Sequence, residues 1–277
     1  MIEVEWTRMT APDLRAIAMQ KAALAILPIG SLEQHGPHLP VVTDTASASE
    51  AAIRAARRVA AETPVAVLPG LWLGMSEHHI PFGGTISVDY ETMNKVLRCI
   101  VRSLKALGFA RLMIVNGHGG NVEPLAVSVR EVAVEFEIPI VSCLPWGLAR
   151  EEALKIFEVD KRSQHACEGE ASIMLAITPE TVRSDRFEQA FAEQTHPLSP
   201  QLGGTRFYSF AEYAPTSGTW GDPRSATAEK GERFLDLQAS ELVKLIQLPT
   251  LWTRPDPVWS PGRGLQSTEG RLSLDMF

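Results

Sequence analysis

The first stretch of the chain that could do chemistry runs from Gly30 to Thr45 and carries Glu33, His35 and Asp44. Glu33 and His35 are two positions apart, so an extended backbone points both side chains to the same side. Asp44 follows a turn that contains prolines, which allows its carboxylate to fold back toward them. One imidazole with two carboxylates is a ligand set suited to Zn, Mn or Fe(II). The pattern predicts a divalent-metal site.

The other histidines follow the same arrangement. Six of the seven fall in four places: His35 and His38, His78 and His79, His118, and His165. The first three places follow apolar runs that are typical of buried strands, at 23–29, 65–68 and 112–115. A Glu and a His in one loop are usually only solvated. However, the carboxyl ends of parallel strands share one edge of a sheet, where ligands bind, so the common placement favours a metal site on that rim.

Helical patterns alternate with these strands. Helices are predicted from about Pro12 to Ala18, over 44–61, from the cap Asp89 to Gly108, over 123–136, from a loop at 165 into a helix ending at 177, and over 225–247. A fourth strand is predicted at 138–141. Four strand-helix units in a row predict an α/β fold, a parallel sheet covered on both faces. Residues 148–164 and 178–224 have no convincing periodicity.

Composition limits the class of protein. The 277 residues are 45% apolar and carry a net charge of −7. We expect one domain over 1–250 and a partly disordered Pro- and Gly-rich arm over 251–277. There is no basic run, so we expect no nucleic acid and no membrane as a partner. No apolar run reaches ~18 residues, no signal peptide is evident, and three scattered cysteines favour a cytoplasmic protein.

Four motifs together resemble the creatininase (creatinine amidohydrolase) family. They are Gly-Ser-x-Glu-Gln-His-Gly-Pro-His-Leu-Pro, Asn-Gly-His-Gly-Gly-Asn, His-Ala-x-Glu-x-Glu and Gly-Asp-Pro-x-x-Ala-Thr-Ala-Glu-Lys-Gly, within residues 20–247. The resemblance implies a three-layer α/β/α sandwich with a mostly parallel central sheet. It also implies a metal-dependent amidohydrolase with one to two divalent ions per chain (Zn, Mn or Fe), a small-molecule substrate and a homohexamer.

The resemblance implies roles for single residues. The residues that match metal ligands are Glu33, His35, Asp44, which bridges the two ions, His118 and Glu170. His165 matches the histidine that handles protons. Two departures stand out: creatininase has Tyr-Glu where this chain has Gly119 and Gly120, and a Trp-Asp pair near residues 162–164, which are Arg, Ser and Gln here. A carboxylate ligand and an aromatic clamp are therefore missing, so creatinine is not the expected substrate.

The residue types also suggest a mechanism. A water shared by two divalent ions has its pKa lowered from ~15.7 toward ~7, which makes a metal-bound hydroxide available to attack a carbonyl. His165 is the candidate donor of a proton to the leaving nitrogen, with Glu168 or Glu170 orienting it or binding metal. His38 lies between prolines and is expected to support the site, whereas His196 is given no role.

Further residues are predicted to contact substrate. A long glycine-rich loop at 69–85 carries Ser76, Glu77 and His78, although surface solvation is an equal alternative for His78 and His79. Gly119 and Trp146 complete the predicted substrate contacts.

The expected reaction is hydrolysis of a C–N bond, other than an ordinary peptide bond, in a small cyclic amide or formamide. One open alternative keeps the metal and cleaves a C–C bond in a cyclic ketone. Another is a non-catalytic protein that binds a nucleotide or phosphosugar at the glycine turn 117–120. A serine nucleophile is not expected, because residues 30–33 lack the Gly-x-Ser-x-Gly pattern.

Overall fold

Four parallel strands form the sheet at the centre of the protein. The computed structural model describes residues 2–159, 165–191, 209–212, 214 and 216–255. Within them the strand order is β2-β1-β3-β4. The strands are β1 (Leu24–Ile29), β2 (Val65–Val67), β3 (Arg111–Asn116) and β4 (Ile140–Cys143). Every residue of β1 is buried, which explains its unbroken apolar run, because a central parallel strand is covered on both faces.

The fourth strand begins at Ile140, two residues later than predicted. Helix α4 (Val122–Phe136) is followed by Glu137, whose φ of 52° turns the chain through the left-handed region. Pro139 has no N–H to donate to a neighbouring strand, so regular pairing starts where Ile140 lies opposite Leu112. The apolar character of residues 138 and 139 therefore reflects the approach to the strand.

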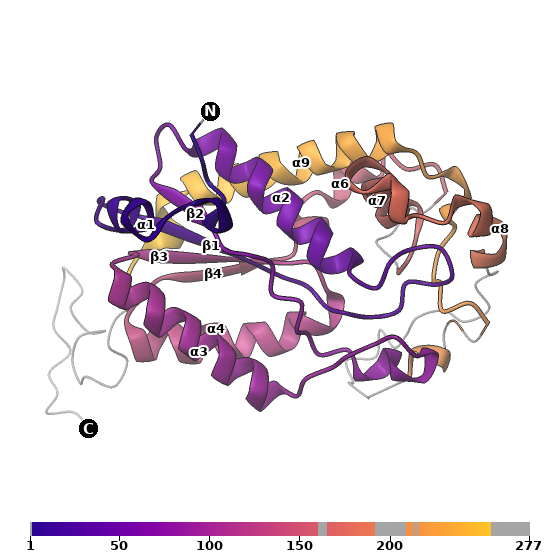
Figure 1. Cartoon of the computed structure of the whole chain (residues 1–277), viewed down its shortest axis with the longest axis horizontal. Helices are drawn as coiled ribbons and strands as arrows, with labels where there is room; N and C mark the ends of the chain where they lie inside the picture. The colour runs from indigo at the N-terminus through magenta and orange to yellow at the C-terminus, as the bar shows by residue number, and fades with distance from the viewer. Residues whose placement is uncertain (1, 160–164, 192–208, 213, 215, 256–277) are drawn as a thin grey trace, which may run out of the picture.

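Helices cover both faces of the sheet. Alternate strand residues such as Leu24 and Ile26 pack on the layer formed by α2 (Thr43–Val59), α7 (Glu168–Ile177) and α9 (Ala228–Gln247). The residues between them, such as Ala25 and Leu27, pack on the layer of α1 (Ala11–Ala18), α3 (Tyr90–Leu107) and α4. Figure 1 shows α2 and α9 above the edge-on sheet and α3 and α4 below it. The predicted three-layer α/β/α architecture is confirmed.

Capping residues set several helix boundaries as the sequence predicts. The side chain of Asp89 accepts a hydrogen bond from the backbone N–H of Thr92 at 2.7 Å, and Gly108 ends α3 with a φ of 114°. The last helix starts later than predicted, at Ala228. The reason is that Asp222 caps a separate short 3₁₀ turn at Pro223–Ser225, and Thr227 then caps α9.

The remaining elements are short. They are the helices α5 (Pro145–Leu148), α6 (Arg150–Ala153) and α8 (Phe187–Ala190) and the 3₁₀ turns Trp6–Arg8, Glu77–Phe82, Gly119–Asn121, Pro179–Thr181, Ser184–Arg186, Phe210–Glu212, Pro223–Ser225 and Pro249–Trp252. Such brief turns explain why 178–224 has no periodicity, although 192–208, like most of the predicted arm from 256 onward, lies outside the described residues. In the part of the chain described, no helix combines the length and apolar character needed to span a membrane.

Helices α7 and α9 cross at a glycine. A Cβ added to Gly231 would lie 2.0 Å from the carbonyl oxygen of Ser172 and 2.9 Å from the backbone nitrogen of Ile173. The backbone of α9 therefore reaches the backbone of α7 with no side chain between them. Because α7 carries Glu170, this contact also fixes the position of that carboxylate.

We expect Gly231→Ala to lower the free energy of unfolding by ~1–3 kcal/mol, as overpacking does, even though Ala is the better helix former. Urea unfolding followed by circular dichroism measures the change. Gly147→Ala in α5 is the control, because a Cβ there meets nothing within 4 Å. Equal stability of Gly231→Ala and the control would contradict a tight crossing.

Candidate metal centre

Five buried ionisable side chains meet at the carboxyl edge of the sheet. Glu33 and His35 come from the loop after β1, Asp44 from the first turn of α2, His118 from the residues after β3, and Glu170 from the first turn of α7. None is more than 7% exposed. The cluster lies at the edge of the sheet that the sequence predicts.

Two glycines let the first turn of α2 approach the strand ends. A Cβ on Gly117, just before His118, would lie 2.3 Å from the carbonyl oxygen of Asp44. A Cβ on Gly30, just after β1, would lie 2.3 Å from the backbone nitrogen of Thr45. Any side chain at either position would displace Asp44, so these glycines set the width of the cluster.

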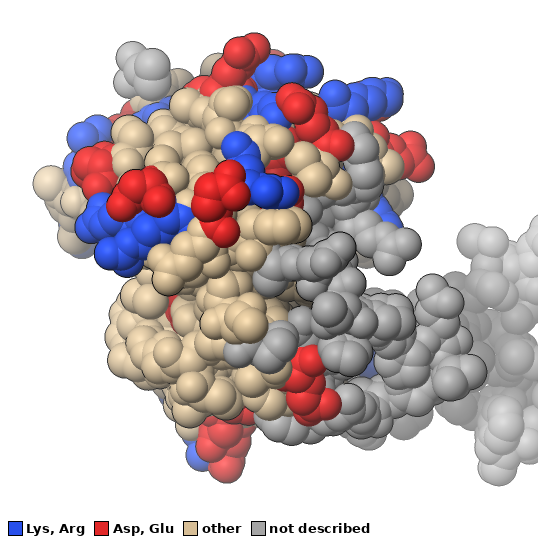
Figure 2. Space-filling view, turned by 90° about the vertical axis from the view of Figure 1, so that its right-hand side faces the viewer, with Lys and Arg blue, Asp and Glu red and all other residues tan. Residues whose placement is uncertain are grey.

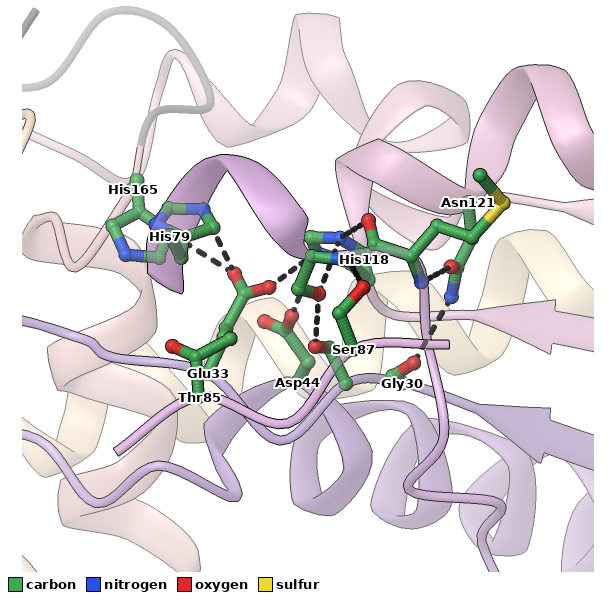
Figure 3. A network of polar contacts seen from close by, with 12 residues as sticks. Gly30, Glu33, Asp44, His79, Thr85, Ser87, His118, Asn121 and His165 are labelled. Carbon is green, nitrogen blue, oxygen red and sulfur yellow. Dashed lines mark hydrogen bonds and ion pairs between the residues drawn. The ribbon is translucent and has the colours of Figure 1, made fainter. Parts of the chain in front are cut away.

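Asp44 lies between two imidazoles. Its Oδ1 is 3.1 Å from Nε2 of His35, and its Oδ2 is 3.1 Å from Nδ1 of His118. Glu33 adds Oε2 at 3.1 Å from the same atom of His118, and Glu170 adds Oε2 at 3.8 Å from Nε2 of His35. Figure 3 shows the carboxylates of Glu33 and Asp44 below the ring of His118, joined to it by dashed lines. The cluster thus divides into two groups that share Asp44.

Each of the two rings has its other nitrogen bound to a backbone carbonyl. Nδ1 of His35 donates to the carbonyl oxygen of Glu33 at 3.1 Å, and Nε2 of His118 donates to that of Met75 at 3.0 Å. These hydrogen bonds select one tautomer for each ring. When either ring is neutral, its other nitrogen carries no hydrogen and directs a lone pair toward the carboxylates.

The lone pairs of this cluster fit a cation. Within the described residues, Oε2 of Glu33 and Oδ2 of Asp44 are buried and accept no well-directed hydrogen bond. Carboxylate oxygens and an imidazole nitrogen that converge away from water are unfavourable unless a positive charge lies among them. Carboxylate and imidazole are ligands for Zn, Mn and Fe(II). The residues present therefore fit a divalent metal ion.

Burial and the short distances between these ionisable side chains also shift their pKa values. Burial lowers the pKa of His35, but the charges of Asp44 and Glu170 outweigh it and raise the pKa to about 10. Burial likewise opposes protonation of His118, yet the neighbouring carboxylates raise its pKa well above the usual range. Burial raises the pKa of Glu170 to about 7. A raised pKa means that the protonated form is favoured. All three groups therefore favour additional positive charge in the cluster.

The predicted substrate residues lie at different depths. Ser76 is fully buried, and its hydroxyl lies 3.1 Å from Nε2 of His118, so it supports that ring from behind. The His78 ring stacks on His118 with centroids 5.8 Å apart. Glu77 is exposed. Gly119 is exposed, with open space where a side chain would be. Of the last three, the ring of His78 contacts a residue of the cluster, whereas Glu77 and Gly119 face solvent.

The roles predicted for Glu168 and Trp146 need correction. The buried carboxylate of Glu168 accepts hydrogen bonds from the Lys230 ammonium at 2.6 Å and from the backbone N–H of Val159 at 2.9 Å. It joins α7 to α9, and we assign it no catalytic role. Trp146 packs in the core, edge-on to Phe234 with centroids 4.5 Å apart. A large apolar ring is more stable there than beside a polar site, so Trp146 is not a substrate contact.

His165 lies beside the cluster, as predicted. Its Nε2 is 2.7 Å from the carbonyl oxygen of Gln34, and its Nδ1 is 3.6 Å from Oε1 of Glu33. The backbone of His165 pairs with that of Trp220 in both directions, at 3.0 and 2.8 Å, which holds the ring in place. His38 is buried and packs edge-on against Phe187, consistent with structural support.

Sequence reasoning missed three residues. His79, expected to be solvated or near substrate, is 2% exposed, and its Nε2 lies 3.3 Å from Oε1 of Glu33. The Gln34 side chain contacts His79 and His165, and Phe210 packs on both rings at 4.3 and 4.8 Å. Figure 3 shows the two rings side by side, facing Glu33. One signal for His79 was available: it lies three positions after the buried Ser76, so one helical turn can bring both to the same side.

Part of the described surface at the carboxyl end of the sheet carries few charges. Figure 2 looks onto the end of the molecule to which the strands point; charged side chains gather over its upper part, in the layer of α7 and α9. Below them is an area with few Lys, Arg, Asp or Glu among the described residues. Exposed apolar side chains from the loops at this end include Val41, Val42, Ile80 and Ile86. This surface suits an uncharged ligand better than a strongly charged one.

Comparisons with known proteins agree with this geometry. A family model described as creatininase (creatinine amidohydrolase) matches residues 7–246. The mycofactocin precursor peptide peptidase of Mycobacterium ulcerans is 34% identical and covers 86% of this chain and 86% of its own. The creatinine amidohydrolase of Pseudomonas putida is 29% identical and covers 76% and 84%. A crystal structure of creatinine amidohydrolase (creatininase) superimposes with a TM-score of 0.76 at 25% identity, covering 89% of this chain and 97% of that one.

The fold, the five side chains at the sheet edge and a family match over most of the sequence agree. The chain therefore belongs to the creatininase family and is a hydrolase of the amidohydrolase type.

Proposed function

We propose that this chain is a metal-dependent amidohydrolase that cleaves a C–N bond in a small, uncharged amide or formamide. The observation that carries the proposal is the carboxylate of Asp44, whose two oxygens each lie 3.1 Å from a nitrogen of a different histidine. In this proposal Asp44 bridges two divalent ions. Glu33 and His118 would hold one ion, and His35 and Glu170 the other.

A divalent ion held there supplies a Lewis acid for the substrate carbonyl and lowers the pKa of a bound water toward ~7. His165 moves the proton. Its Nε2–H donates to the carbonyl of Gln34, so Nδ1 is the atom left to carry a proton. Burial, together with the charge of His35, holds the pKa of His165 well below its usual range. The neutral ring would accept a proton from the attacking water and then give it to the leaving nitrogen.

Packing argues against a phosphate-binding protein. A Cβ on Gly117 would meet the backbone of Asp44, and one on Gly120 would lie 2.4 Å from Nε2 of His118 and 2.5 Å from the carbonyl oxygen of Met75. Gly117 and Gly120 thus serve the close packing of the protein itself. For the same reason Gly120 leaves no room for the carboxylate that creatininase has at this place, which supports a substrate other than creatinine.

Other features of the proposal rest on the ligand types and on the family. Zn, Mn and Fe(II) are the candidate metals, with one to two ions per chain, because imidazole and carboxylate suit all three. We place the enzyme in the cytoplasm, where free thiols such as those of Cys99, Cys143 and Cys167 stay reduced. The substrate is a small molecule.

A substrate panel tests the reaction. Protein purified without chelator would be assayed with Zn, Mn or Fe(II) against cyclic amides, formamides, short peptides and cyclic ketones, with product detected by mass spectrometry. Hydrolysis of an amide or formamide that stops after chelation supports the proposal. Turnover confined to cyclic ketones would assign C–C bond cleavage instead, and no metal in the purified protein would overturn the metal-dependent mechanism.

The variant Asp44→Asn tests whether the Asp44 carboxylate binds both metal ions or only lies near them. We expect this variant to lose most of its metal and its activity, because a neutral amide cannot balance two dications. Inductively coupled plasma mass spectrometry measures metal per chain. Asp185→Asn, at an exposed position in a 3₁₀ turn, serves as the control and should keep its metal. Full metal occupancy in Asp44→Asn would exclude the bridging role.

His165→Ala tests the proton carrier. We expect turnover to fall by ~10²–10⁴-fold with metal retained, as for the loss of a general acid. A substrate with a better leaving group should recover much of the rate, because its nitrogen no longer needs the proton. Loss of metal, or no recovery with the activated substrate, would instead place His165 among the ligands.

Assembly is a separate proposal. The family resemblance implies a homohexamer, and exposed apolar side chains such as those of Val122 and Val127 on α4 provide surface for contacts between copies. Sedimentation velocity of the full chain should give the mass of six copies. A monomer at micromolar concentration would refute it.

A further inference from the structure

The amide of Gln34 lies between two histidine rings beside the candidate metal centre. Its side chain is buried, at 7% exposed. The rings of His79 and His165 are stacked with centroids 4.4 Å apart. Nε2 of Gln34 is 2.9 Å from Nδ1 of His79, 3.0 Å from Nε2 of His165 and 3.0 Å from the carbonyl oxygen of Gly218. One amide group therefore contacts both rings and a distant loop.

The orientation of this amide is fixed by its oxygen. Oε1 of Gln34 accepts a hydrogen bond from the backbone N–H of Gly36 at 2.9 Å. If the amide were reversed, its nitrogen would face that N–H and its oxygen would face the carbonyl oxygen of Gly218. Both contacts would be repulsive and would leave buried groups unsatisfied. The nitrogen of Gln34, with two hydrogens, must therefore face the histidines.

The hydrogens available for these contacts then determine the tautomer of each histidine ring. Nε2 of His165 lies 2.7 Å from the backbone carbonyl of Gln34, so this nitrogen carries a hydrogen and cannot accept one from the amide. The two amide hydrogens go to the carbonyl of Gly218 and to Nδ1 of His79. Nδ1 of His79 is therefore without a hydrogen. A neutral His79 ring must carry its hydrogen on Nε2, which faces Oε1 of Glu33 at 3.3 Å.

We infer that Gln34 is a positioning residue: its side-chain amide fixes the tautomer of His79, and its backbone carbonyl fixes the tautomer of His165. The amide makes His79 a hydrogen-bond donor to Glu33, and the carbonyl leaves Nδ1 of His165 free to carry a proton. His79 then acts on the centre only through Glu33, even though its ring nitrogen is close enough to the carboxylate to suggest a ligand. The kinetic part of this inference rests on the proposed function, whereas the tautomers do not.

Histidine ¹⁵N NMR of the zinc-loaded protein measures the tautomers of the rings without any activity assay. The His79 signals are identified by their absence from His79→Gln. We expect wild-type His79 to be neutral, with its hydrogen on Nε2. Gln34→Glu keeps the shape but replaces the donor by a carboxylate, and we expect Nδ1 of His79 to gain a hydrogen. Wild-type His79 with its hydrogen on Nδ1, or with Nε2 bound to zinc, would overturn the inference; so would an Nδ1 of His79 that stays bare in Gln34→Glu.

Kinetics and metal analysis give an independent readout. With the best substrate of the panel, we expect Gln34→Glu and Gln34→Met to lower kcat by ~10–100-fold, as for other residues that orient a metal site. KM and metal per chain should stay within about twofold. Gln238→Met, at a buried glutamine of α9, controls for the loss of a buried amide and should keep wild-type kcat. Unchanged kcat in both Gln34 variants, or a loss of kcat equal to that of Gln238→Met, would overturn the positioning role.

Discussion

Buried lone pairs that converge at one edge of the sheet are the constraint on which this structure depends. Oε2 of Glu33 and Oδ2 of Asp44 face the same nitrogen of His118 at 3.1 Å. While His118 is neutral at Nδ1, no donor in the described residues satisfies those two oxygens. Such an arrangement stores unfavourable electrostatic energy in the folded chain unless a cation is bound. Binding of a metal by these residues would therefore stabilise the fold as well as enable the reaction.

The cluster is held mainly by backbone groups. The His35 ring donates to the carbonyl of Glu33, the His118 ring donates to the carbonyl of Met75, and the carboxylate of Glu170 accepts from the backbone N–H of Ala166 at 2.5 Å. Backbone groups at the ends of strands and helices move little, because the sheet and the packed layers fix them. Preorganised ligands of this kind need little rearrangement when an ion enters.

Residue type and position along the chain predicted the rim and the grouping of Glu33, His35 and Asp44, whereas His118 and Glu170 were expected as ligands from the resemblance to the creatininase family. All five lie just after a strand or in the first turn of a helix, which helps to bring them to one edge. The wrong predictions for individual residues arose because long-range packing is not visible in the sequence. Glu168 and Glu170 are two apart at the start of one helix, so they point in different directions, and only the position of Lys230 in α9 decides which one is used structurally. Long-range packing likewise placed Trp146 in the core and buried His79.

The most distant motif of the sequence, at 221–231, contributes no side chain to the cluster of five, and the structure explains its presence. Lys230 pairs with Glu168, and Gly231 lets α9 touch the backbone of Ser172. Just before the motif, Gly218 accepts from the amide of Gln34, and Trp220 pairs with the backbone of His165. These contacts hold α7 and the loop before it against the sheet. Since α7 carries Glu170 and the loop carries His165, this segment sets the distance between the candidate metal centre and the proposed proton carrier.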